Sequence, residues 1–469
     1  MNLLVRSTVL VFAMTGCFLD HSDDPDPGTP GGNGGGGNGG GSNGGGGPRP
    51  IEHGDQTMSD VHAQPGGEQV WIIHSAVADV HAATRVTTAH FGAYVPAQNQ
   101  FIDVLDTTGT LGKRILFPTK DRVLLVAQRG ENQDVFVSID TVTHRPLAQR
   151  SYPGDHTNFR VSPSGRALTA TSMAPALELI DTQSLVLQPL PATTTFRDSA
   201  WASQADFLYV IDLQGDLTRL QRFDLRTADL SQFGPVPERL STVPGTGYAL
   251  AISPDDHFAA IALRDAANVA QVTLLDLTVA NPTPITVPCD ALPVFTSDNR
   301  LVVWQPNPDH THDLRLITPA TGAATAPLTI EYQLPPATIP LRSAPALLAQ
   351  PFPFEDKPPF LYNTTTGART PLTGPLFPSS WFERPGHNEL WLWEEYEDTL
   401  SRLDLNTGAM TEMLRDVDSV DFRAATDDII VGTFDHSVFH LSMATGAVTS
   451  PFILADPNEV AAPFKLATD

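Results

Sequence analysis

A pair of histidines flanked by two aspartates is the most obvious candidate for metal chemistry in this sequence. His310 and His312 stand two residues apart between Asp309 and Asp313, in the run DHTHD. On an extended strand both imidazoles would lie on one face, and a His-x-His pair with nearby carboxylates is a fragment of many metal sites. Such a site needs at least one further ligand. The competing interpretation is a solvated hairpin tip, and we assign no metal ligand here.

The other histidine groups give weaker indications of chemistry. His74 and His81 flank Asp79 in an N-terminal stretch without a clear pattern. His436 and His440 are four residues apart, but they fall on a predicted strand, where this spacing does not have the geometry that it has on a helix. We expect no function from either group.

Two acidic runs are candidates for contact with a cation. The segment DVDSVD (416–421) offers Asp416, Asp418 and Asp421 to Ca²⁺, but it lacks the glycine and the terminal glutamate of an EF-hand loop. The segment WEEYED (393–398) is interpreted as a solvated hairpin tip. Neither run is assigned a metal.

Motifs of the common enzyme classes are absent from the sequence. Outside the glycine-rich residues 31–47, where glycine matches are incidental, it contains no G-x-S-x-G elbow, no H-E-x-x-H pair, no Walker loop and no dinucleotide-binding glycine pattern. Cys289, in VPCDAL, has no catalytic partner nearby, and a lone cysteine usually fills space in a core. We therefore predict no catalytic residue, no cofactor-binding residue and no cofactor.

The composition favours strands and disfavours nucleic acid as a partner. The chain has 53 Asp and Glu against 28 Lys and Arg, a net charge of -25, which repels phosphates. Its hydrophobic fraction of 41% can bury a large core. The polar remainder is dominated by Thr, Ser, Asn, Gln, Pro and Gly, which favour strands and turns over helices.

A strand-turn unit recurs along most of the chain. It alternates apolar residues up to an Asp or another small polar anchor, passes through a turn that often ends in Thr-Gly, and continues into a second short strand. Examples are LELIDTQSLVLQPL (177–190) and LSRLDLNTGAMTEML (400–414). The nine anchors are Asp106, Asp140, Asp181, Asp224, Asp276, Thr318, Asn363, Asp404 and Ser442. Their spacing of about 42 residues is typical of four-stranded propeller blades.

A second repeated element precedes most of these hairpins. It is a turn of Ser, Pro, Asp, Asn or Gly that leads into an apolar strand, as in VSPSGRALTAT (161–171), ISPDDHFAAIA (252–262) and FTSDNRLVVW (295–304). The element resembles the Ser-Pro-Asp-Gly turn of TolB-type β-propellers, over roughly residues 115–455. Only 162–165 and 253–256 approach the full motif, as SPSG and SPDD.

These repeats predict an all-β fold, a β-propeller of four-stranded blades spanning residues 61–469. Eight turn elements pair with eight hairpins, so we expect eight blades, with seven as the alternative. The hairpin at 101–115 is left over, preceded by QVWIIH (69–74), and is expected to help close the ring or to form a shortened blade. Closure would combine strands from both ends of the chain in one blade, giving a monomeric domain.

The N-terminus has the features of a lipoprotein signal. Residues 1–16 place Arg6 before an apolar run that is too short for a permanent membrane span. The sequence MTGC resembles the lipobox of bacterial lipoproteins, which implies cleavage before Cys17 and acylation of its thiol. The alternative is an ordinary secretory signal with an incidental cysteine. The residue after the cysteine is Phe18 and not Asp, and the resemblance therefore implies the outer membrane.

Residues 17–60 are predicted to be a disordered tether. An acidic, proline-rich stretch is followed by 13 glycines in the 17 residues 31–47, and such a composition cannot bury surface. A tether after a lipidated cysteine would hold the folded domain away from a membrane that it contacts only through the lipid.

Two classes of function remain open at this point. The first is a binding or scaffold module on the cell envelope, whose partner would be an envelope protein, a peptide or a polysaccharide. The second is a propeller enzyme, such as a hydrolase, a lyase or a quinone-dependent dehydrogenase, with its site at the channel mouth. A structural part of a larger envelope assembly is a further alternative. The absence of catalytic motifs favours the first.

Overall fold

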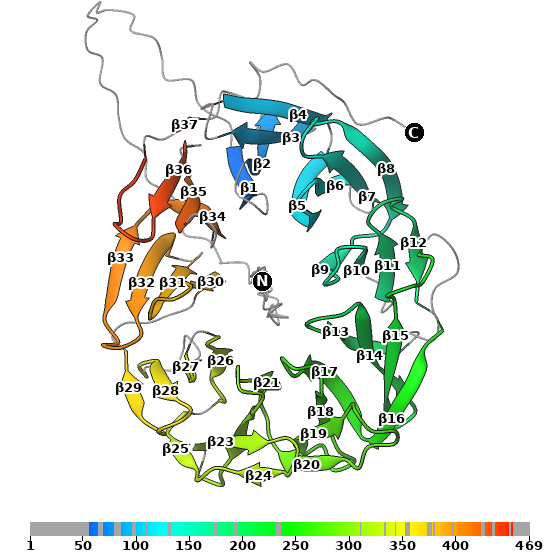
Figure 1. Cartoon of the computed structure of the whole chain (residues 1–469), viewed down its shortest axis with the longest axis vertical. Helices are drawn as coiled ribbons and strands as arrows, with labels where there is room; N and C mark the ends of the chain where they lie inside the picture. The colour runs from blue at the N-terminus through cyan, green and yellow to red at the C-terminus, as the bar shows by residue number, and fades with distance from the viewer. Residues whose placement is uncertain are drawn as a thin grey trace, which may run out of the picture.

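The structure of the chain is a computed structural model (Figure 1). It describes residues 56–63, 69–78, 86–95, 100–108, 110–129, 133–172, 177–190, 195–230, 236–309, 311–332, 334–342, 344–351, 357–372, 378, 380–394, 397–423, 427–433, 437–449 and 452–453. Cys17 and the predicted signal and tether lie outside these residues, except for 56–60. Within the described ranges, no helix has the length and apolar character of a membrane span.

The described strands form nine sheets that stand as blades around a central axis (Figure 1). Each sheet is built from strands that follow one another in the sequence, and the first strand of each blade lies nearest the axis (Figure 1). Eight sheets have four strands, and the sixth has five because its outer edge is divided between two short strands that pair with β23. The predicted β-propeller is confirmed.

The nine blades follow the chain order. Blades 1 to 3 contain β1 (Gln56–Ala63), β2 (Val70–Ala78), β3 (Val86–Val95), β4 (Gln100–Thr108); β5 (Thr110–Thr119), β6 (Arg122–Arg129), β7 (Gln133–Asp140), β8 (Pro146–Pro153); β9 (Thr157–Val161), β10 (Ala167–Thr171), β11 (Leu177–Asp181), β12 (Leu187–Pro189). Blades 4 to 6 contain β13 (Phe196–Trp201), β14 (Phe207–Gln214), β15 (Leu217–Asp224), β16 (Glu238–Pro244); β17 (Thr246–Ile252), β18 (Phe258–Arg264), β19 (Ala270–Asp276), β20 (Ile285–Pro288); β21 (Val294–Phe295), β22 (Leu301–Pro306), β23 (His312–Thr318), β24 (Ala323–Ala324), β25 (Leu328–Ile330). Blades 7 to 9 contain β26 (Ala337–Pro340), β27 (Ala346–Gln350), β28 (Phe360–Asn363), β29 (Arg369–Pro371); β30 (Ser380–Glu383), β31 (Glu389–Glu394), β32 (Thr399–Asp404), β33 (Met410–Leu414); β34 (Val417–Arg423), β35 (Asp428–Thr433), β36 (Ser437–Ser442), β37 (Phe452–Ile453).

The predicted number of blades, eight or seven, is wrong. Residues 101–115 do not form a hairpin, because β4 ends blade 1 and β5 begins blade 2. The strands β1 to β4 make a complete additional blade, blade 1, whose β3 and β4 pair from Val95↔Gln100 onward. The link from β3 to β4 carries no polar-Thr-Gly signature, so the repeat search could not recognise this blade.

Closure of the ring also differs from the expectation. No sheet of the described residues combines strands from the two ends of the chain, since blade 9 consists of β34 to β37 alone. Instead β1 contacts β34 and β35, and the rings of Tyr94 and His440 meet edge to face with centroids 6.4 Å apart. The first and last blades therefore meet by packing of sheet faces, as other neighbouring blades do.

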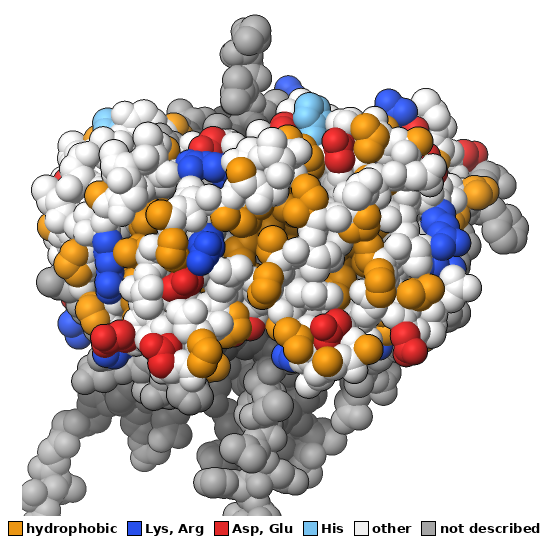
Figure 2. All heavy atoms as spheres, turned by 90° about the horizontal axis from the view of Figure 1, so that it is seen from below, with side chains coloured by type: hydrophobic (Ala, Val, Ile, Leu, Met, Phe, Trp, Pro, Cys, Tyr) orange, Lys and Arg blue, Asp and Glu red, His pale blue; other side chains and the backbone are white. Residues whose placement is uncertain are grey.

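The hydrophobic core lies between blades and is divided among the junctions. Trp71 of blade 1 packs in one cluster with Ile115 and Val123 of blade 2, while Phe136 of blade 2 packs with Leu168 of blade 3. The central strands read as nearly continuous buried runs because both of their faces are covered by neighbouring sheets. Figure 2 views the wall from the side of blades 5 and 6; its apolar side chains lie between blades, and charges of both signs are scattered singly.

The polar anchor of the repeat serves the turn between the third and fourth strands of a blade, called here the 3–4 turn. Asp181 Oδ1 accepts hydrogen bonds from the backbone N–H groups of Gln183 at 3.0 Å and Ser184 at 2.6 Å. In the turn that begins at Asp404, the residue four positions later is Gly408, at φ 72°, in the left-handed region that glycine adopts at least cost. Apart from Asp106, which lies on β4, the recurring Asp and Gly are thus turn residues.

The turn between the first and second strands of a blade is called here the 1–2 turn. Where this turn departs from the Ser-Pro-Asp-Gly motif, the residue that replaces glycine has a structural role. Asp256 and Asn299 replace the glycine and adopt φ values of 62° and 63°. Asp256 accepts the N–H of Ser203 in the preceding blade at 2.6 Å, and Asn299 Oδ1 accepts that of Asp255 at 3.1 Å. Asp and Asn tolerate this backbone conformation, and here their side chains also join neighbouring blades.

Candidate functional site

His312, the central candidate from the sequence, is a buried link between strands. The residue is 3% exposed; Nδ1 lies 2.9 Å from the carbonyl of Tyr332, and Nε2 lies 3.1 Å from Asp290 Oδ2. Asp309 caps its own loop by accepting hydrogen bonds from Thr311, and His310 lies outside the described residues. Both ring nitrogens of His312 are engaged within the protein, so its role here is structural.

The other candidate histidines are not brought together. His440 Nδ1 lies 2.9 Å from Asp428 Oδ2 on the neighbouring strand. His74 lies on β2, where only its backbone is described, while Asp79, His81 and His436 fall outside the described residues.

The predicted acidic runs lie at blade 9 and just before it. Asp416 occupies the turn before β34 at φ 58°, and Asp418 and Asp421 lie on β34, the innermost strand of that blade (Figure 1). In the segment 393–398, Trp393 donates its indole N–H to the carbonyl of Val417, and residues 395 and 396 are outside the described part. Across the residues that the structure describes, no three His, Cys, Asp or Glu side chains are grouped to hold a metal ion.

Cys289 is buried, as the sequence predicts. Its side chain is inaccessible, and burial raises the pKa of the thiol to about 11. Because the thiolate is the reactive form of cysteine, Cys289 is a poor nucleophile at neutral pH.

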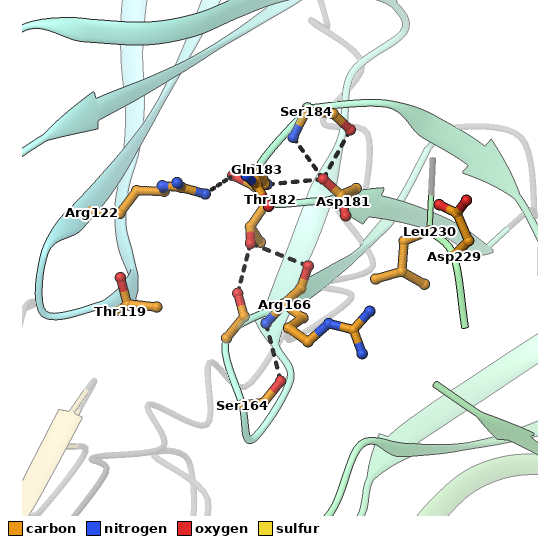
Figure 3. Close-up of a pocket in the computed structure, with 11 residues that line it drawn as sticks. Thr119, Arg122, Ser164, Arg166, Asp181, Thr182, Gln183, Ser184, Asp229 and Leu230 are labelled. Carbon is orange, nitrogen blue, oxygen red and sulfur yellow. Dashed lines mark hydrogen bonds between the residues drawn. The ribbon is translucent and has the colours of Figure 1, made fainter. Parts of the chain in front are cut away.

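A groove on the face that carries the 1–2 and 3–4 turns is the candidate binding site (Figure 3). It spans blades 2, 3 and 4 and has a volume of about 560 Å³. Thr119 and Arg122 come from blade 2, Arg166 and Gln183 from blade 3, and Leu230 from blade 4. Most lining side chains are polar, and rigid turns present them.

The floor of the groove is a close contact between two backbones. Gly165 adopts φ +78°, and a Cβ at this position would lie 1.8 Å from the carbonyl oxygen of Pro118 in blade 2. Thr182 Oγ1 donates to the carbonyls of Gly165 at 2.7 Å and Arg166 at 3.1 Å, which ties the two turns of blade 3 together. Only glycine both adopts this positive φ at low cost and lacks the Cβ that would clash with Pro118. The backbones of blades 2 and 3 are therefore in direct contact at position 165.

Two arginines of the groove join each blade to the next. Arg122 Nη1 donates to the carbonyl of Thr182 at 3.2 Å (Figure 3). Arg166 donates through Nη1 and Nη2 to three carbonyls that follow β15, those of residues 225, 226 and 228. Among the described residues neither guanidinium forms an ion pair with a carboxylate. Both keep N–H groups that have no partner within the described ranges of the chain.

Arg300 of blade 6 has a carboxylate partner, which Arg122 and Arg166 lack among the described residues. Its Nη1 donates to the carbonyl of Thr364 in blade 7 at 3.0 Å, as Arg122 does to Thr182. Asp298, two residues earlier, neutralises it with Oδ2 at 2.8 Å from Nε and 2.6 Å from Nη2. The corresponding positions two residues before Arg122 and Arg166 are Lys120 and Ser164. The junction between blades 2 and 3 thus keeps a positive charge that the junction between blades 6 and 7 cancels.

Further polar groups of the groove are available to a ligand. The side-chain amide of Gln183 and the hydroxyl of Thr119 are exposed and make no hydrogen bond within the described part of the chain. Oδ1 of Asp181 accepts hydrogen bonds within its own turn. Beside the unpaired arginine, these groups can receive a polar or anionic ligand by hydrogen bonding.

The opposite end of the same junction holds a buried histidine between two carboxylates. His156, 1% exposed, places Nδ1 at 2.9 Å from Asp134 Oδ2 of blade 2 and Nε2 at 2.8 Å from Glu178 Oε2 of blade 3. Burial by itself would lower the pKa of His156, but the hydrogen bonds and charges of the two carboxylates outweigh it and raise the pKa to about 9. A charged imidazolium therefore joins blades 2 and 3 at neutral pH.

Sequence reasoning missed both the groove and the buried histidine. The turn elements FPTKDRVLLVA (117–127) and VSPSGRALTAT (161–171) carry Arg122 and Arg166, but Arg122 and Thr182 are 60 residues apart and meet only because blades 2 and 3 are adjacent. The signal that could have found the groove is an arginine after a 1–2 turn without an acid two residues earlier.

Comparison with known proteins gives similarity of fold only. No protein-family model matches the chain, and no curated protein sequence does. Similar solved structures include the Dos1 propeller, 11% identical with TM-score 0.47 over 81% of this chain and 92% of that one. AztD from Citrobacter koseri is 15% identical, with TM-score 0.44 over 71% and 96% of the two chains. BamB from Moraxella catarrhalis is 12% identical, with TM-score 0.42 over 70% and 94%.

Proposed function

We propose that this chain is a binding module of the bacterial cell envelope. Cys17 carries the lipid that anchors it, and residues 17–60 form a tether between the lipid and the propeller. The MTGC sequence and the glycine-rich stretch support the anchor, and Phe18 favours the outer membrane. The propeller presents its groove to a protein, a peptide or a polysaccharide.

The observation that carries the binding function is the groove of blades 2 to 4. It gathers donors that have no partner among the described residues, on turns held by a hydrogen bond within blade 3 and another from blade 2 to blade 3. Binding groups on a rigid frame lose little conformational entropy when a ligand arrives, which favours recognition.

The anchor is tested by a single substitution followed by fractionation. Cys17→Ser removes the acylated thiol, so the protein should move from the membrane fraction to the soluble periplasmic fraction. Metabolic labelling with a fatty acid should mark the wild type and not the variant. A variant that still sediments with membranes as the wild type does would exclude the lipid anchor.

The binding face is tested by photo-crosslinking in cells. A photoreactive residue at Gln183 lies in the groove, whereas the same residue at the exposed Gln214, the last residue of β14 on the opposite face, serves as the matched control. We expect a discrete adduct from position 183 and none from position 214. Equal adducts from both positions, or none from either, would contradict a groove-centred binding function.

A further inference from the structure

The guanidinium of Arg122 is half-buried. It makes one hydrogen bond, at 3.2 Å to the carbonyl of Thr182, and among the described residues it has no carboxylate partner. The chain carries 53 acidic residues against 28 Lys and Arg, so cations without acid partners are expected to be uncommon. A partly desolvated charge whose donors are unsatisfied costs free energy, and an external anion would compensate it.

A second arginine of the same chain provides a direct comparison with Arg122. Arg300 performs the same blade-joining task and is neutralised by Asp298. Joining blades therefore does not require an unpaired arginine. What distinguishes Arg122 is that Lys120 stands at the position that corresponds to Asp298, in a groove that Gln183 and Thr119 also line.

We propose that this groove binds the carboxylate side chain of an acidic peptide segment of a partner protein. Arg122 receives the carboxylate through Nε and Nη2, which Thr182 leaves free, because a guanidinium edge matches a carboxylate with two parallel hydrogen bonds. The Gln183 amide and the Thr119 hydroxyl bind neighbouring polar groups of the peptide. Arg166 lines the groove as well and offsets one of the two carboxylates, Asp181 and Asp229, that also line it. The inference rests on the proposed binding function and specifies its ligand.

The chemistry of the lining favours a peptide over a polysaccharide. Sugar rings are commonly held by stacking on aromatic side chains, and no aromatic residue lines the groove among the residues described. The net charge of -25 repels an acidic partner at long range. At physiological salt the Debye length is about 8 Å, so this repulsion is largely screened while contacts inside the groove persist.

The test measures peptide binding to the full chain made lipid-free by Cys17→Ser. The probe is a fluorescent, end-capped peptide of alternating glutamate and serine, compared by anisotropy at physiological salt with its glutamine twin and with a labelled galacturonic acid oligomer. Arg122→Gln keeps an N–H group for the Thr182 carbonyl and removes the charge. Lys120→Asp supplies an internal carboxylate two residues before Arg122, as Asp298 does for Arg300. Arg300→Gln is the matched control.

We expect the glutamate peptide to bind at least about tenfold more tightly than the glutamine twin, and Arg122→Gln and Lys120→Asp each to weaken it about tenfold. Arg300→Gln should leave binding unchanged. Should Arg122→Gln fail to fold, Lys120→Asp decides. Equal binding of the two peptides, or no effect of the deciding variant, overturns the proposal.

Two further outcomes separate this inference from others. Binding of the uronic acid oligomer alone, with the same dependence on Arg122, overturns the peptide assignment. If the adduct at Gln183 forms undiminished in the Lys120→Asp background, the groove still binds a partner and only the acidic-peptide inference fails.

Discussion

An arginine joins blade 2 to blade 3, and another joins blade 6 to blade 7. The two junctions differ in the groups that surround the arginine. Both use an arginine after a 1–2 turn that donates to a carbonyl in the next blade. At blades 6 and 7 the arginine has its own carboxylate, and the indole N–H of Trp304 donates to Thr338 Oγ1 across the junction at 3.0 Å. Blades 2 and 3 use a backbone contact at Gly165, an arginine without an acid, and a charged histidine.

The difference between the two junctions shows where a repeat protein can bind a ligand. When the arginine at a junction has a carboxylate partner inside the protein, as Arg300 has, the junction contributes stability alone. When one partner is missing, the same structural element has a group left for an external ligand.

Gly165→Ala should be the most damaging substitution at the junction of blades 2 and 3. The new Cβ would meet the Pro118 carbonyl oxygen at 1.8 Å, and φ +78° is itself unfavourable for alanine. We expect a loss of about 4 kcal/mol in the free energy of unfolding, measured by denaturant titration. Gly386→Ala is the control: its φ is +74°, but no atom lies within 4 Å of the Cβ, so it should cost about 1 kcal/mol. Similar losses at both positions would show that close packing at Gly165 is unimportant.

His156→Gln should be nearly as costly. Glutamine cannot carry the positive charge that compensates Asp134, which is fully buried, and Glu178. We expect a loss of about 3 kcal/mol at pH 6, because removing one partner leaves buried charge uncompensated. Asp134→Asn should also destabilise, and the two losses should not add in the double variant. Additive losses would mean that the pair does not interact.

The sequence predicts the repeating part of this fold well and its junctions poorly. Alternating strands and the anchors such as Asp181 and Asp404 are local signals, so the hairpins of blades 2 to 9 were visible. Blade 1 was missed because its link from β3 to β4 lacks those residues. His312 was chosen by spacing, but one face of its strand is covered by a neighbouring sheet, and the covering residues come from distant positions. Contacts such as that of Arg122 with Thr182 depend on the order of blades, which no short motif records.

The wild-type protein should become less stable as the pH rises above neutrality. The folded pKa of His156, about 9, lies above its ordinary value of 6.5. Its contribution is therefore complete below about pH 6.5 and is lost as the pH rises through 9. Between pH 6 and pH 8 we expect the free energy of unfolding to fall by about 2 kcal/mol through this group. His156→Gln should lack this part of the pH dependence, and identical profiles for both proteins would place the titration elsewhere.

The smallest effect is expected from the change that makes blades 6 and 7 resemble blades 2 and 3. Asp298→Asn removes the charge that neutralises Arg300, and the hydrogen bond from Arg300 to the Thr364 carbonyl can remain. Asp298 is about half exposed, at 47%, and solvent screens the pair, so the free energy of unfolding should fall by about 0.5 kcal/mol. Thermal unfolding of Asp298→Asn beside Asp298→Ala measures this loss and separates the charge from the hydrogen bond that Asp298 accepts from Thr296. A loss several times larger would mean that an arginine at a junction needs its carboxylate for stability. Arg122 would then be destabilising unless an external anion were bound, and the contrast between the two junctions would be one of stability as well as of binding.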